Sequence, residues 1–115
     1  MARNTRPISW FKGALRDFQD FPQGAQIEMA RALTILAEGQ MPDIAKPLTG
    51  FGGGVMEFAL RHRGEAFRVV YALQTGDDIW ILHAFQKKSK SGIKTPKQDI
   101  DLIHARLKRL KEILK

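Results

Sequence analysis

The sequence predicts an α+β fold: a strand and two helices, then a three-stranded antiparallel meander, then a last helix. Three consecutive segments between residues 55 and 85 are rich in β-branched and aromatic residues, and short turns containing glycine separate them. This pattern is typical of antiparallel strands joined by hairpins. Apolar residues at helical spacing lie before and after these segments. We therefore expect helices packed on one face of the sheet, with the other face open.

Length and composition indicate a single domain over residues 1–115. The chain has 43% apolar residues and ten aromatic ones, enough for one core. It contains no apolar run near the roughly 20 residues of a membrane span, and its first residues lack the apolar centre of a signal peptide. No cysteine is present and the three histidines have no metal-binding spacing. We expect a cytoplasmic protein with no cofactor, no metal and no membrane partner.

The first part of the chain predicts a short strand and two helices. Residues 8–11 form the candidate strand, and apolar side chains at helical spacing over 11–18 indicate a short amphipathic helix. A second helix should run from Pro22 to about Glu38, because proline is tolerated in a first helical turn. Gly39 is a plausible end for it.

The rest of the chain predicts the meander and the last helix. A loop rich in glycine and proline over 40–54 leads into strands at 55–61, 65–74 and 79–85. The first strand alternates apolar and polar residues, whereas the other two are nearly continuously apolar, as strands at the centre of a sheet are. A polar loop over 89–94 precedes a helix that should run from about Thr95 to near Lys115.

The positive charge is concentrated at one end of the sequence. Residues 1–85 hold nine Lys/Arg and nine Asp/Glu, whereas residues 86–115 hold ten Lys/Arg and three Asp/Glu. The whole net charge of +7 therefore lies in the last thirty residues. Such a basic segment suggests an acidic partner such as nucleic acid or an acidic protein, and a helix with a lysine-rich solvated face is the alternative.

Cationic and imidazole side chains interrupt the apolar strands. Arg68 lies within one strand, and an unpaired charge there is costly to bury. It therefore either points to solvent, pairs with Glu57 or Glu65, or binds an anion. The other interruptions lie at strand ends, at residues 61–63 before a glycine turn and at His83 and residues 86–88.

These residues resemble a known family. KPLTG at 46–50, Glu57, RHR at 61–63, FRVVY at 67–71 and HAFQKKS at 83–89 are similar to the RelE/ParE superfamily of bacterial toxins, and within it to the phage-related, HigB-like branch. The resemblance covers about residues 8–112. It implies a RelE-like, microbial-ribonuclease-like fold and the toxin of a type II toxin–antitoxin pair.

The resemblance also implies an activity and partners. The usual activity is endoribonuclease cleavage of mRNA in the ribosomal A site, so the ribosome and mRNA are expected partners. A cognate helix-turn-helix antitoxin would neutralise the toxin by direct binding. Operator DNA would be bound only through the antitoxin complex.

Site residues carry over one by one. The family arginine before the paired valines matches Arg68, the basic residue ending the preceding strand matches Arg61, and the basic pair after the last strand matches Lys87 and Lys88. Two departures stand out: RelE has lysines along the strand that here holds Glu57 and Ala59, and its tyrosine near the C-terminus has no counterpart after Tyr71. His83 is the natural substitute as acid or base, with His62 second.

Metal-independent RNA cleavage by the 2′-OH needs a base, an acid and cations for the charge on the phosphorus centre. Imidazole suits proton transfer near neutral pH, and arginine binds phosphate oxygens in a bidentate fork. Phe85 would either stack on a base or belong to the core. The predicted catalytic set is His83, Arg68, Arg61 and Lys88, and the predicted RNA-binding set is Lys46, His62, Arg63, Phe85, Lys87 and Lys90.

Other functions stay open at this point. ParE-like proteins share the fold but inhibit DNA gyrase and cut no RNA. A non-enzymatic basic module that binds RNA or an antitoxin would also account for the charge. A degenerate toxin that is kept only as a component of a repressor complex is a further possibility.

Overall fold

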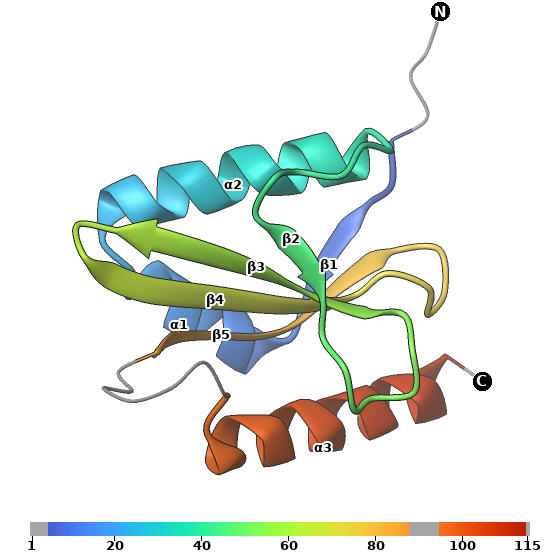
Figure 1. Ribbon diagram of the computed structural model, residues 1–115. Helices are drawn as coiled ribbons and strands as arrows, with labels where there is room; N and C mark the ends of the chain where they lie inside the picture. The colour runs from blue at the N-terminus through green and yellow to red at the C-terminus, as the bar shows by residue number, and fades with distance from the viewer. Residues whose placement is uncertain (1–4, 88–94, 115) are drawn as a thin grey trace, which may run out of the picture.

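A five-stranded mixed sheet forms the middle layer of the protein (Figure 1). The structure is a computed structural model and describes residues 5–87 and 95–114. The sheet has the order β1-β5-β4-β3-β2, with β1 parallel to β5 and the other neighbours antiparallel. The elements are, in chain order, β1 (Ile8–Trp10), α1 (Lys12–Gln19), α2 (Gln23–Ala37), β2 (Ala45–Pro47), β3 (Val55–His62), β4 (Glu65–Ala72), β5 (Ile79–Lys87) and α3 (Lys97–Ile113).

The predicted fold class is confirmed, and the predicted elements are present with ends that differ by a few residues. The sequence did not reveal β2, a strand of three residues at the sheet edge. Its signal is weak because Pro47 cannot donate a ladder hydrogen bond, and proline is confined to edge strands for that reason. β1 was predicted as a strand, but its parallel pairing with β5 at the opposite edge was not.

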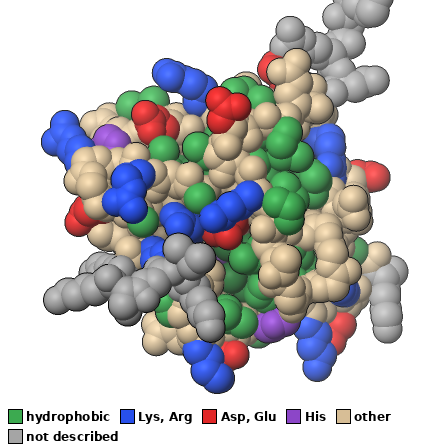
Figure 2. Space-filling view, viewed as in Figure 1, with side chains coloured by type: hydrophobic (Ala, Val, Ile, Leu, Met, Phe, Trp, Pro, Cys, Tyr) green, Lys and Arg blue, Asp and Glu red, His purple; other side chains and the backbone are tan. Residues whose placement is uncertain are grey.

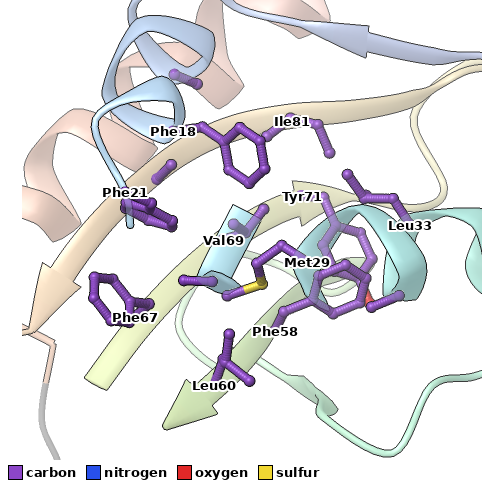
Figure 3. Close-up of a cluster of buried hydrophobic side chains, with 14 of the residues drawn as sticks. Phe18, Phe21, Met29, Leu33, Phe58, Leu60, Phe67, Val69, Tyr71 and Ile81 are labelled. Carbon is purple, nitrogen blue, oxygen red and sulfur yellow. The ribbon is translucent and has the colours of Figure 1, made fainter. Parts of the chain in front are cut away.

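One face of the sheet packs against α1 and α2. This larger core is built from apolar side chains of both helices and of alternate positions on β3, β4 and β5. Met29 and Leu33 of α2 lie over Phe58 and Tyr71, as Figure 3 shows. Aromatic contacts continue toward α1, where the Phe21 ring lies 4.9 Å from that of Phe67.

The other face packs against α3, so the prediction that the helices occupy only one face is wrong. Figure 1 shows α3 on the side of the sheet opposite α2. Three buried side chains of α3, Ile103, Leu107 and Leu110, lie in a second core together with Val70 and Leu82. The physical reason is visible in the strands: nearly continuous apolar runs in β4 and β5 have apolar residues on both faces, so both faces need cover.

α3 covers this second face only in part. Along β3 the alternate residues that face α3 pass from buried Val55 and Glu57 to exposed Arg61. The end of the β3–β4 hairpin is therefore the open part of the face. Among the described residues, no helix has both the length and the apolar character needed to cross a membrane.

The hydroxyl of Tyr71 gives a test of the larger core. Tyr71 is fully buried, its hydroxyl has no hydrogen-bond partner among the described residues, and burial raises the pKa of the phenol. An unsatisfied buried hydroxyl costs about 1–3 kcal/mol. We expect Tyr71→Phe to raise the free energy of unfolding by about 1 kcal/mol at neutral pH, measured by urea denaturation.

The same variant has a pH signature. Above pH ~10 the phenol ionises in the unfolded chain but not in the folded one, so the wild-type protein loses stability as pH rises and the variant lacks this loss. Phe58→Ala, whose ring lies 4.8 Å from that of Tyr71, is the control and should lower stability by about 3–5 kcal/mol. A clear loss of stability in Tyr71→Phe would show that the hydroxyl is bonded.

Candidate functional site

The predicted polar residues meet in three cross-strand rows on the face that α3 partly covers. The strand register aligns Glu57, Val70 and His83 in the first row, and Lys46 of β2 extends that row beside Glu57. The second row is Ala59, Arg68 and Phe85, and the third is Arg61, Ala66 and Lys87. Alternate residues of a strand share a face, and Val70 and Phe85 pack with α3, which fixes the face concerned. We call these three rows with Lys46 the cationic face.

A β-bulge brings the β5 residues to this face. Val70 pairs with His83 but Tyr71 pairs with Ile81, so Leu82 is an extra residue on β5. A strict alternation continued from Leu82 would turn His83 toward α1 and α2. The extra residue resets the alternation, and His83 faces α3 together with Phe85.

Arg68 forms an ion pair with Glu57 across neighbouring strands. The Arg68 Nε atom lies 3.2 Å from Glu57 Oε1, and the side chains are 14% and 8% exposed. Oε1 has no hydrogen bond among the described residues, so the contact is electrostatic and not a well-aligned hydrogen bond. Of the alternatives for Arg68, pairing with Glu57 is the one that the structure shows.

Three cations surround the single carboxylate of Glu57. The pKa of Lys87 is lowered, first by burial and then by the positive charges of Arg68 and Lys46, while Glu57 acts in the opposite direction. Figure 2 shows Lys and Arg side chains gathered around an acidic patch in the middle of this side of the molecule. Because Glu57 balances only one of the three cations, this part of the face keeps a net positive charge.

His83 lies at the deep end of the cationic face. It is 3% exposed, its Nε2 lies 2.7 Å from Oδ1 of Asp99 in the first turn of α3, and its ring stacks on Phe85 with centroids 5.0 Å apart. Nη1 of Arg106 is 3.5 Å from the other ring nitrogen and donates to the Leu82 carbonyl. The imidazole is therefore held in one orientation between α3 and Phe85.

The other predicted residues differ in where they lie. Arg61 is exposed at the open end of the cationic face, where its Nη1 donates to the carbonyl of Gly64. Phe85 is buried in the smaller core, which is the alternative to base stacking that the sequence left open. Lys88 and Lys90 lie outside the described residues.

His62 and Arg63 are not brought to the cationic face. The His62 ring lies against Gly24 at the start of α2, where a β-carbon would come within 2.6 Å of its Cε1 atom. Arg63 occupies the hairpin turn with a φ of 51°. The odd–even alternation along β3 explains the separation, because His62 points to the face opposite Arg61.

The place of Glu57 in the site was not predicted from the sequence. Glu57 was noted as a possible partner for Arg68 and as a departure from the RelE pattern, but its central position follows only from the strand register. In the described part of the chain, no group of three or more His, Asp or Glu side chains is arranged to hold a metal ion.

The sheet order and the helices on its two faces define a fold class, that of the RelE-type toxins. A solved mutant of the E. coli toxin RelE in the free state matches with a TM-score of 0.59 at 11% identity, over 91% of this chain and 97% of that chain. The model of the phage-derived Gp49-like family matches residues 16–108, and the chain belongs to this family. The predicted membership of the RelE-type toxin superfamily is thereby confirmed.

The RelBE2 toxin–antitoxin complex of Mycobacterium tuberculosis matches with a TM-score of 0.49 at 18% identity, over 76% of this chain and 98% of that chain. Comparison with curated proteins gives no significant match.

The charge balance of the cationic face can be tested through Lys87. Glu57→Gln removes the negative charge that raises the Lys87 pKa, so we expect that pKa to fall further. Arg68→Gln removes a positive charge that lowers it, so the pKa should rise. An NMR pH titration of the lysine side chains measures both shifts. Lys97, whose side chain is 87% exposed, is the internal reference, and shifts of the same sign in the two variants would contradict the arrangement.

Proposed function

We propose that this protein is the toxin of a type II toxin–antitoxin system and acts as a ribosome-dependent mRNA endoribonuclease that needs no metal. Its family and fold support a toxin of the RelE type. The observation that supports ribonuclease activity is the cationic face, where Lys46, Arg68 and Lys87 surround the buried Glu57 carboxylate. Cations held in place around a proton acceptor are what 2′-OH attack on a phosphodiester requires.

The cations would bind the scissile phosphate. Arg68 and Arg61 lie in adjacent rows, and a guanidinium binds two phosphate oxygens at once. Lys87 lies in the same row as Arg61 and would contact the neighbouring backbone. Negative charge that develops on the phosphorus centre would meet cations already in position, so little reorganisation is needed in the transition state.

Proton transfer would fall to Glu57 and His83, which flank Val70 in one row. Neighbouring strands are about 4.8 Å apart, so the two residues lie roughly 10 Å apart at the backbone and leave room for one nucleotide linkage. Glu57, released from Arg68 by the incoming phosphate, takes the 2′-OH proton. The 2′-oxygen bonds to phosphorus and the P–O5′ bond breaks, giving a 2′,3′-cyclic phosphate. The leaving 5′-oxygen takes its proton from Nδ1 of a protonated His83, because Nε2 is held by Asp99.

The burial of both residues fits a requirement for the ribosome. Glu57 and His83 are 6% and 3% exposed, so a free RNA strand reaches them only in a restricted pose. The ribosome would supply that pose, and orientation of this kind can account for much of a rate enhancement. The lysines and arginines in the second half of α3 would dock on ribosomal RNA with salt-sensitive affinity.

The proposed partner for neutralisation is a helix-turn-helix antitoxin. An acidic segment of it would cover the cationic face by charge complementarity and block access to Arg68. Binding of operator DNA would then belong to the complex and not to this chain alone.

The proposal predicts loss of cleavage from changes on the cationic face. In a translating bacterial extract, Arg61→Ala and Lys87→Ala should each slow cleavage by about 10²-fold, since each removes a cation from the developing charge. Glu57→Gln and His83→Asn should slow it by about 10²–10⁴-fold through lost proton transfer. The rate is followed by mapping new mRNA 5′ ends.

Two controls keep this experiment decisive. Lys97→Ala removes an exposed cation away from the face and should leave the rate unchanged. Urea denaturation of each variant is needed, because breaking a buried ion pair can cost about 3–5 kcal/mol. Inhibited gyrase supercoiling without new 5′ ends in the extract would favour a gyrase inhibitor over the ribonuclease. If the folded protein causes neither effect, a non-enzymatic binding module is favoured.

A further inference from the structure

A second groove lies at the far end of β5 from Lys87, between the start of α1 and the second half of α3. Its volume is about 420 Å³, which falls within the roughly 300–1,000 Å³ of small-ligand pockets. With a rise of about 3.3 Å per residue, Trp80 in this groove lies roughly 20 Å along β5 from Lys87. The groove therefore opens at the opposite end of β5 from Lys87, and Arg106, which lies 3.5 Å from His83, is the residue that connects it to the deep end of the cationic face.

The charged side chains that line this groove are all cationic. Lys12 of α1 and Arg106 and Arg109 of α3 contribute to the lining, and the described lining residues include no carboxylate. Lys12 and Arg109 are exposed at the rim, whereas Arg106 is half-buried. Asp17, outside the lining, acts on Arg106, so the exposed Lys12 and Arg109 give the groove its excess positive charge, and an occupant would carry negative charge.

Aromatic rings form the apolar part of the same groove. Trp80 and Phe11 contact each other edge to face, with ring centroids 5.9 Å apart and an interplanar angle of 73°. Trp10 also lines the groove and is held by the ring of Phe18, 5.0 Å away. Both tryptophans are partly buried. Trp10 packs against the larger core, whereas Trp80 and Phe11 pack against the smaller one beside α3, so Trp80 and Phe11 supply the aromatic surface beside the three cations.

Arg106 is fixed in place by contacts from two elements. Its Nη1 donates to the Leu82 carbonyl over 2.8 Å. A β-carbon at position 13 would overlap its guanidinium, so Gly13 makes space for the arginine at the surface of α1. The groove thus has a charged side chain that is already ordered before any ligand binds, which reduces the entropy lost on binding.

We propose that this groove is a second binding site for single-stranded RNA, in which bases contact the aromatic rings and the backbone phosphates pair with Lys12, Arg106 and Arg109. Aromatic platforms bordered by cations are the usual means of binding single strands without sequence preference. The choice of RNA over other single strands rests on the proposed function of the cationic face. The proposal that the groove binds phosphates and bases does not depend on that function. An acidic protein segment would satisfy the cations but would offer no flat base to the partly exposed ring of Trp80.

The two tryptophans of the chain make the site directly measurable. Trp10 and Trp80 are the only tryptophans in the sequence, and both line this groove. We expect oligoadenylate to change the intrinsic fluorescence of the full chain at low salt, and Trp80→Phe to reduce the amplitude. Arg109→Ala should weaken binding roughly tenfold and lower the slope of log K against log salt by about 0.7.

Matched variants separate this site from general basicity. Lys108→Ala and Lys111→Ala remove exposed cations of α3 that do not line the groove, and Lys97→Ala removes one from its first turn. All three should bind oligoadenylate nearly as the wild type does. Equal effects of Arg109→Ala and Lys108→Ala would overturn the proposal.

Two further outcomes bear on the inference. An absent fluorescence change, or an equal response to oligoglutamate, would also overturn it, the latter in favour of an acidic protein partner. Binding of oligoadenylate that persists while no mRNA cleavage is found in extracts would support the groove and reject the proposed ribonuclease. Cleavage of mRNA without oligoadenylate binding would support the ribonuclease and reject the groove as an RNA site. The two proposals can therefore fail independently.

Discussion

The pairing of Arg68 with Glu57 is the constraint on which the polar face depends. A sheet whose central strands are apolar on both faces has little room for charge, and an unpaired guanidinium in its middle would be costly. Glu57 resolves this cost by placing one carboxylate 3.2 Å from Arg68. That single negative charge then holds Lys46 and Lys87 nearby without neutralising them. The result is a buried ion pair inside a cationic surface.

The bulge at Leu82 is the second device that shapes this face. Without the extra residue, the alternation of β5 would separate His83, Phe85 and Lys87 from Arg68. With it, β5 contributes apolar residues to both cores at its start and polar residues to one face at its end. α3 then divides that face, because its apolar stripe covers the middle of the sheet and its first turn supplies Asp99 to His83. Bulges next to functional sites commonly re-aim side chains in this way.

Much of the fold could be predicted from periodicity, because long apolar patterns decide element type. The α+β class and the positions of three helices and four strands were visible in this way. The continuous apolar runs of β4 and β5 also imply that both sheet faces are covered. The expectation of an open face did not take these runs into account. β2 could not be found, since three residues ending in proline have no periodic signal.

The site was less predictable, because its geometry depends on register and side-chain direction. The residue types at Arg68, Lys87 and His83 were sufficient to nominate them. Residue type does not distinguish His62 from Arg61, and only the alternation of β3, which continues to His62, turns His62 to the opposite face.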